Sequence, residues 1–285
     1  MQFDTLIEVE QLRTRSKHGA WVLLDCRFDL NAPKAGRTAF EDAHIPGAQY
    51  ADLNLDLAGP LTQRSGRHPL PEPTVFAKTA SAWGIGDETQ TIVYDEANGS
   101  FAARAWWLLR WIGLTRVAVL NGGIAAWRQA GECVESGAAA TRSPGSLRAR
   151  PCPALALSVE EVIRALTDPG RLLVDARAAD RYLGRAEPID PVAGHVPGAV
   201  NFPFSRNLGS DGRFLPREVL RAQWDAELLG RPADGVISMC GSGVTACHNL
   251  LALEVAGLGG ARLYPGSWSE WVRDPGRPVA RGPAP

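Results

Sequence analysis

Residues 236–246 of the chain are Val236-Ile237-Ser238-Met239-Cys240-Gly241-Ser242-Gly243-Val244-Thr245-Ala246. A short apolar run, a loop with two glycines and the start of a helical apolar pattern follow one another, which predicts a strand, a tight loop and a helix. Such a loop turns backbone N–H groups inward at a helix N-terminus, and both features favour a thiolate at Cys240. The alternative is a buried structural cysteine that closes a strand.

The architecture follows from an internal repeat with a period of about 150 residues. The matching blocks are residues 21–27 with 172–177, residues 43–48 with 194–199, residues 92–95 with 237–240, and residues 120–127 with 263–271. Because the blocks recur in the same order at a nearly constant offset, we predict that the chain is two copies of one domain.

Within each copy, apolar runs alternate with helical patterns. In the first copy the runs are residues 21–24, 91–94 and 117–120, and residues 100–112 have helical spacing. This alternation predicts an α/β fold of two tandem domains, each a mainly parallel sheet with helices on both faces. We place the domains at residues 1–140 and 150–285, joined by the small, polar residues 136–146. Reactive loops in such sheets follow the carboxyl ends of strands, where Asp95 and Cys240 fall.

Composition excludes several classes of function. The formal net charge of the 285 residues is -1, which favours neither a nucleic acid nor a membrane surface as partner. No apolar run approaches the ~20 residues of a membrane span, and the start of the chain shows no signal peptide. Five scattered cysteines without a Cys-x-x-Cys pair argue against a disulfide framework or a zinc site. We therefore expect a cytoplasmic protein that needs no metal and no cofactor.

The segment Cys240-Gly241-Ser242-Gly243-Val244-Thr245-Ala246 resembles the active-site loop of the mercaptopyruvate sulfurtransferases, within the rhodanese family. Thiosulfate-specific rhodaneses usually carry an arginine and a lysine where this chain has Gly241 and Ser242. The repeated His-x-Pro-Gly-Ala block and the Gly-Ser-Trp-x-Glu-Trp block at residues 266–271 extend the resemblance over nearly the whole chain. It implies two rhodanese-like domains, of which the first is catalytically silent because Asp95 stands at the position of Cys240.

The resemblance implies transfer of sulfur through Cys240. The thiolate would attack the sulfur of a small-molecule donor and carry a persulfide until a thiol such as thioredoxin, or cyanide, removes it. Ser242 would donate a proton to the departing enolate, although a serine between glycines is also a common loop former. Four loop residues would hold the outer sulfur with their backbone amides: Gly241, Gly243, Val244 and Thr245.

A donor with a carboxylate needs a cation near the loop. Arg181 matches an arginine of the family signature, and a guanidinium pairs with a carboxylate in a bidentate way. The family's mercaptopyruvate enzymes usually carry a second arginine nine residues further on, where this chain has Asp190. Arg185 is a candidate to replace it. If Asp190 weakens anion binding, Asp190→Arg should improve the KM for mercaptopyruvate.

Three alternative functions compete with this interpretation. The first is a thiosulfate:cyanide sulfurtransferase that uses the same cysteine. The second is a phosphatase or arsenate reductase, which would need Cys-x5-Arg, but the position six residues after Cys240 is Ala246. The third is a non-enzymatic interaction module, which Asp95 makes credible for the first copy and Cys240 argues against for the second.

Overall fold

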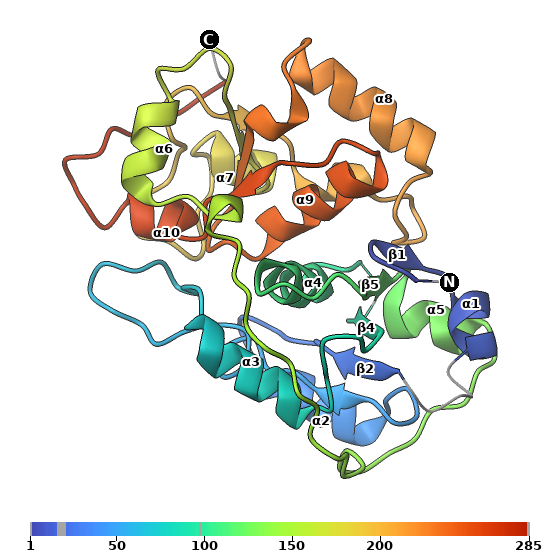
Figure 1. Ribbon diagram of the computed structural model, residues 1–285. Helices are drawn as coiled ribbons and strands as arrows, with labels where there is room; N and C mark the ends of the chain where they lie inside the picture. The colour runs from blue at the N-terminus through green and yellow to red at the C-terminus, as the bar shows by residue number, and fades with distance from the viewer. Residues whose placement is uncertain (1, 16–20, 97, 284–285) are drawn as a thin grey trace. The chain divides into compact units, whose positions relative to one another are not determined.

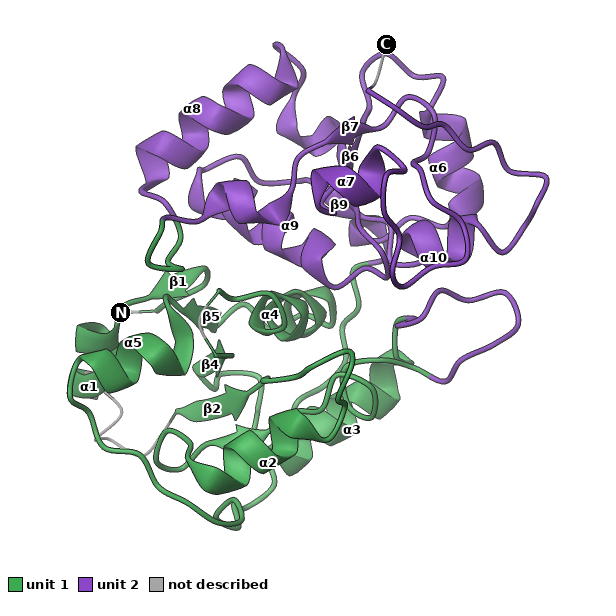
Figure 2. Ribbon diagram, turned by 180° about the vertical axis from the view of Figure 1, so that it is seen from behind, with its two compact units in different colours: residues 1–59, 70–152, 210–214 green, residues 60–69, 153–209, 215–285 purple. Residues whose placement is uncertain are grey.

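A computed structural model describes residues 2–15, 21–96 and 98–283, so Ala97 of the Asp95 loop and both chain ends lie outside the description. The chain forms two compact units (Figure 2). Unit 1 comprises residues 1–59, 70–152 and 210–214, and unit 2 comprises residues 60–69, 153–209 and 215–285. Residues 60–69 belong to the first sequence repeat, yet they are part of unit 2.

Unit 1 is a parallel sheet between helices (Figure 1). Its strand order is β1-β5-β4-β2-β3, and every described pairing is parallel. The strands are β1 (Leu6–Ile7), β2 (Val22–Asp25), β3 (Gln49–Tyr50), β4 (Thr91–Tyr94) and β5 (Val117–Leu120). The helices are α1 (Val9–Arg15), α2 (Ala35–Asp42), α3 (Pro73–Ala82), α4 (Ala102–Trp111) and α5 (Gly123–Gln129). The strands and the helix predicted from the apolar runs and helical spacing of residues 21–120 are confirmed to within two residues.

The core of unit 1 forms because strands β2, β4 and β5 are mostly apolar and are buried along their whole length. Alternate strand residues face opposite sides of a sheet, so such strands need helices on both faces. One face packs against apolar residues of α1, α2 and α5. Helix α4 contacts β4 and β5, and all but one of its residues are buried.

Unit 2 repeats this plan with the strand order β7-β6-β8-β9, again with parallel pairings. Its strands are β6 (Leu172–Asp175), β7 (Val200–Asn201), β8 (Val236–Met239) and β9 (Arg262–Leu263). Its helices are α6 (Val159–Ala165), α7 (Ala179–Tyr182), α8 (Arg217–Leu228), α9 (Thr245–Val255) and α10 (Ser267–Trp271), with 3₁₀ turns at Pro153–Leu155, Phe204–Asn207 and Ala233–Gly235. Apolar residues of α6, α7 and α10 cover one face of the sheet, and α9 contacts β8.

Each unit contains a buried ion pair directly after its first long strand. Arg177 donates to both oxygens of Asp175 and, through Nη2, to the carbonyl of Gly194 (2.7 Å). Arg27 makes the same bonds to Asp25 and to the carbonyl of residue 43 in unit 1. These pairs tie the turns of the repeated His-x-Pro-Gly-Ala blocks to the sheets. In each turn the histidine Nδ1 lies beside a carbonyl oxygen, that of Phe40 for His44 (2.7 Å) and that of Tyr182 for His195 (2.8 Å). Among the described residues, no helix has both the length and the apolar character needed to cross a bilayer.

Candidate active site

The cysteine loop follows the carboxyl end of β8, next to the carboxyl end of β6. The chain leaves β6 towards β7 and returns to β8 on the other side of β6, so the strand order reverses here. Ligand sites of open parallel sheets form at such reversals. Cys240 comes directly after β8 and α9 begins at Thr245, which confirms the predicted strand, loop and helix.

The first turn of α10 fixes the backbone of this loop. The N–H of Cys240 donates to Ser267 Oγ (3.0 Å). The N–H groups of Trp268 and Ser269 donate to the carbonyls of Cys240 (3.0 Å) and Gly241 (2.9 Å). Cys240 is only 2% exposed. Because these bonds satisfy the backbone at the strand end, the sulfur is carried on a rigid support.

The rest of the loop is tightly fitted. Gly243 has φ of +76°, and a Cβ there would lie 2.5 Å from the carbonyl oxygen of Pro265, so only glycine fits. Val244 is the residue before α9, and Thr245 is its half-buried first residue. The predicted loop residues therefore form one continuous turn between Cys240 and the helix.

Unit 1 shows what the equivalent loop does with an anion. The carboxylate of Asp95, which is 2% exposed, accepts the N–H of Gly99 (2.9 Å), Phe101 (2.9 Å) and Ala102 (3.2 Å). The loop after β4 thus directs amides at the negative group placed at the end of that strand. In unit 1 these amides are bonded to the carboxylate of Asp95 itself, which lines a pocket of about 350 Å³.

Ser242 is paired with a histidine that the sequence analysis did not identify. Ser242 Oγ lies 2.8 Å from Nδ1 of His68, and both residues are about 5% exposed or less. His68 belongs to residues 60–69 of unit 2 and is far from Ser242 in sequence. Serine and histidine at this distance can exchange a proton.

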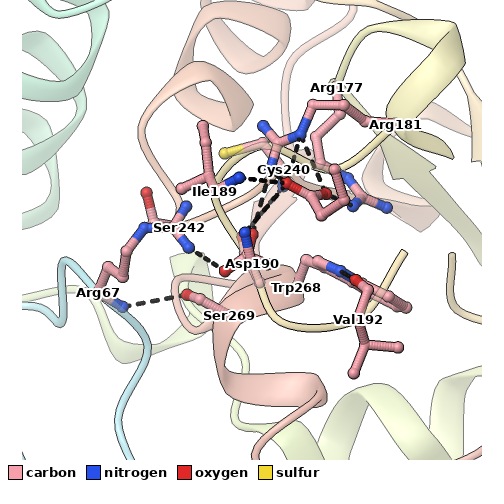
Figure 3. A network of polar contacts seen from close by, with 12 residues as sticks. Arg67, Arg177, Arg181, Ile189, Asp190, Val192, Cys240, Ser242, Trp268 and Ser269 are labelled. Carbon is pink, nitrogen blue, oxygen red and sulfur yellow. Dashed lines mark hydrogen bonds and ion pairs between the residues drawn. The ribbon is translucent and has the colours of Figure 1, made fainter. Parts of the chain in front are cut away.

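The guanidinium groups of Arg67 and Arg181 lie over Gly241. Figure 3 shows both side chains beside Asp190. A methyl group built on Gly241 would lie 3.0 Å from Nη2 of Arg67 and 3.4 Å from Nη2 of Arg181. Arg181 was predicted from the sequence, whereas Arg67 was not. The absence of a side chain at Gly241 leaves room for both cations directly beside Cys240.

An acidic pair holds the two arginines. Arg181 donates through Nε (3.0 Å) and Nη2 (2.7 Å) to Glu187 Oε1, and its Nη2 also donates to Asp190 Oδ2 (3.1 Å). Nη1 of Arg67 donates to the other oxygen of Asp190, and its backbone N–H donates to Ser269 Oγ (3.0 Å). Asp190 therefore bridges the two guanidinium groups, with one oxygen on each.

The pKa values of the two carboxyl groups are shifted in opposite directions. Burial opposes ionisation of Glu187, but the hydrogen bonds and charge of Arg181, together with the backbone hydrogen bonds from Asp190 and Ile189, outweigh it and hold the pKa of Glu187 below its usual value. Burial raises the pKa of Asp190, although the charge of Arg67 acts in the opposite direction. Glu187 also accepts hydrogen bonds from Arg177 Nη1 (3.2 Å) and from two backbone amides, so its carboxylate is held in one position beside Arg181.

Arg185 does not share these contacts. Its side chain is 70% exposed, and its nearest ionic partner is Asp180 at 3.6 Å. The sequence carried no local signal for Arg67 or His68, because residues 60–69 have no apolar period and lie in the other repeat. Only the fold brings them to the cysteine loop.

Comparison with known proteins identifies the family to which this chain belongs. The family model of the rhodanese-like domain matches residues 8–130 and 158–274. A probable 3-mercaptopyruvate sulfurtransferase of Pseudomonas aeruginosa is 49% identical over 284 residues, which cover 99% of this chain and 100% of that protein. A putative thiosulfate sulfurtransferase of Mycobacterium tuberculosis, SseB, is 38% identical over 263 residues, which cover 92% of this chain and 91% of that protein.

A solved structure agrees with the sequence comparison. The 3-mercaptopyruvate sulfurtransferase from Leishmania major matches with a TM-score of 0.84 at 29% identity. The match covers 94% of this chain and 74% of that one.

Proposed function

The chain belongs to the rhodanese family and is a sulfurtransferase, and from this we propose that it moves sulfur from 3-mercaptopyruvate through a persulfide on Cys240 to a thiol or to cyanide. The observation that carries the proposal is the environment of Cys240. A cysteine at the end of β8 adjoins two guanidinium groups over Gly241 and a serine paired with a histidine. Together these supply a nucleophile, a carboxylate site and a proton donor.

In the first half-reaction the thiolate of Cys240 attacks the donor sulfur. The new S–S bond forms as the S–C bond of the donor breaks, and the bonding electrons pass to carbon as the enolate of pyruvate. The sulfur atom stays on Cys240 as a persulfide. Amides of the loop from Gly241 to Thr245 would hold its negative charge, as the equivalent loop holds the carboxylate of Asp95.

Ser242 would supply the proton that the enolate needs. Its hydroxyl lies beside Cys240 in the loop, and His68 Nδ1 at 2.8 Å can replace the proton after transfer. Protonation at carbon gives pyruvate, which leaves. The pair therefore makes the departure of the carbon group easier without taking part in the sulfur transfer itself.

Arg181 would hold the donor carboxylate near the sulfur. Glu187 fixes this guanidinium through Nε and Nη2, and the group lies beside Gly241. A positioned arginine places the donor for attack and discriminates against donors without an anion.

In the second half-reaction an acceptor thiolate, such as that of thioredoxin, or cyanide attacks the outer sulfur and restores the Cys240 thiolate. Unit 1 takes no chemical part, because Asp95 cannot accept sulfur and its carboxylate already fills the loop. The cysteines form no disulfide among the described residues, which is consistent with the cytoplasm as the proposed compartment.

The test is a sulfur-loading experiment on the full chain. Incubation with 3-mercaptopyruvate and no acceptor should add one sulfur atom to the peptide that contains Cys240 and release one pyruvate. Cys240→Ser should abolish both, whereas Cys247→Ser, which removes a buried thiol from the same peptide, should keep both. Sulfur on any other residue, or turnover by the Cys240→Ser variant, would refute the proposal.

Thiosulfate is the second candidate donor. It is favoured by the presence of Asp190 where the family has an arginine, and by the resemblance to a relative named as a putative thiosulfate sulfurtransferase. Steady-state kcat/KM for the two donors with cyanide as acceptor decides between them. A higher value for thiosulfate would change the donor and leave Cys240 as the sulfur carrier.

A further inference from the structure

Unit 1 has a pocket of its own at the carboxyl end of its sheet, the place that corresponds to the cysteine loop of unit 2. Its volume is about 350 Å³, which lies within the range of roughly 300 to 1,000 Å³ of small-molecule sites. The walls come from residues 27–29 after β2, from α2, and from Asp95, Glu96, Asn98 and Phe101 between β4 and α4. Asp95 stands where unit 2 has its cysteine, so a role for this pocket lies in binding and not in sulfur transfer.

The charge of this pocket is opposite to that of the site in unit 2. In the sequence repeat Glu96 follows Asp95 as Gly241 follows Cys240. A carboxylate therefore stands where unit 2 has a glycine with two guanidinium groups over it. The exposed Asp29 adds a further carboxylate to the lining. These groups repel the anionic donors of unit 2 and attract a cation.

The cations near Glu96 leave its carboxylate accessible to a ligand. Arg27 lines the pocket, but its guanidinium donates to both oxygens of Asp25, which neutralises its charge. Nη1 of Arg27 and Nη1 of Arg128 lie 3.5 and 3.4 Å from the two oxygens of Glu96, beyond the roughly 2.7 to 3.2 Å of a normal hydrogen bond. The side chain of Glu96 is 59% exposed. It can therefore approach a ligand cation without first breaking a strong ion pair.

Two phenyl rings form the largest apolar part of the pocket. The rings of Phe28 and Phe101 meet edge to face, with centroids 5.7 Å apart and planes at 69°. In the repeat Phe28 stands at the position of Ala178, so unit 1 has an aromatic side chain where unit 2 has a methyl group. Ala35 and Ala39 of α2 add methyl groups to the lining. An aromatic ring attracts a cation, and the lining as a whole favours a ligand with an apolar body.

We propose that the pocket of unit 1 binds a small organic cation, namely an amine that carries an aromatic or other apolar body. The ammonium group lies at the carboxylates of Glu96 and Asp29, and the apolar body packs against Phe28 and Phe101. The inference is independent of the proposed sulfur transfer, because the residues that line this pocket are separate from those around Cys240.

The experiment titrates the full chain with 2-phenylethylammonium, an amine with one phenyl ring, and follows binding by saturation-transfer NMR. A ligand of this size that fills the pocket should bind with a Kd of about 1 mM or below. The probe 2-phenylethanol has the same shape without the charge, and we expect it to bind about fivefold more weakly. Phenylacetate carries the opposite charge and should bind more weakly than either.

Three variants locate the binding site. The double variant Asp29→Asn/Glu96→Gln keeps the shape of both side chains and removes their charge. It should raise the Kd of the amine about fivefold and leave that of 2-phenylethanol unchanged. Phe28→Ala introduces the residue that unit 2 has and should weaken the binding of both probes. Glu10→Gln removes an exposed carboxylate of unit 1 that lies outside the pocket and should change neither Kd. Melting temperatures show whether each variant is folded.

Each outcome decides the inference. No binding of the amine at about 10 mM, well above the expected Kd, overturns it, as does equal binding of the amine and phenylacetate. An unchanged Kd for the amine in the folded double variant places the amine elsewhere and also overturns it. Sulfur transfer from 3-mercaptopyruvate is measured on the same samples. Amine binding without transfer contradicts the proposed function alone, and transfer without amine binding contradicts this inference alone.

Discussion

Replacing Asp95 by alanine should cost stability but little activity. The carboxylate is buried and accepts three backbone N–H bonds in the loop after β4. Removing it leaves three amides without their acceptor, at about 1 kcal/mol or more each. Burial raises the pKa of Asp95 despite these bonds, so desolvation offsets part of their value. We expect a loss of about 3 kcal/mol in the free energy of unfolding.

Urea unfolding measures this loss, with two comparison variants. Asp95→Asn keeps one acceptor oxygen and should lose about half as much. Asp29→Ala removes an exposed carboxylate from the same unit and should change stability by less than about 0.5 kcal/mol. An Asp95→Ala variant as stable as the native chain would refute the account of the loop.

The same variant tests whether unit 1 is catalytically silent. At a temperature where Asp95→Ala is folded, turnover of 3-mercaptopyruvate should stay within a few fold of the native rate, because the nucleophile is in unit 2. A loss on the order of a hundredfold, or ~2.7 kcal/mol of barrier, would show that the Asp95 loop takes part in catalysis.

Two further predictions concern the acidic pair at the site. Asp190→Arg alone should destabilise the chain by about 2 kcal/mol in urea unfolding, because it removes the counter-charge of Arg67 and Arg181 and adds a third cation. For the same reason, the lower KM for mercaptopyruvate that the sequence predicts for this variant should not be observed. The double variant Arg67→Asp/Asp190→Arg should recover at least half of the loss, and failure to do so would argue against a direct pair. Glu187→Gln should lower the melting temperature at neutral pH, because the pKa of Glu187 is held below its unfolded value and its ionised form stabilises the fold. This stabilisation is present above the unfolded pKa of about 4.3 and is lost as the pH falls through the folded pKa. The difference in melting temperature between Glu187→Gln and the native chain should therefore shrink in acid, and a constant difference would contradict a stabilising role for the ionised carboxylate.

The sequence alone determined the architecture and singled out Cys240 as the proposed nucleophile. Apolar runs of four residues predicted the strands, and their repetition at a constant offset predicted two copies of one domain. Cys240 and Asp95 were found because each directly follows such a strand, and the residues around them decide the local backbone. These signals are short in range, so they can be read from neighbouring residues.

The tertiary structure decided which side chains surround the sulfur. Arg67 and His68 lie in a loop without apolar period, and folding places them against residues more than 120 positions away. The interpretation of Asp190 also changed. The sequence showed only that it replaces an arginine of the family, whereas the structure shows that it pairs with Arg67, a cation from another segment. Contacts of this kind depend on how loops close over the sheet, and the residues involved carry no local preference that would reveal them. The chemistry of the cysteine could thus be predicted from its own segment, whereas the groups that would bind the donor could be identified only once the chain had folded.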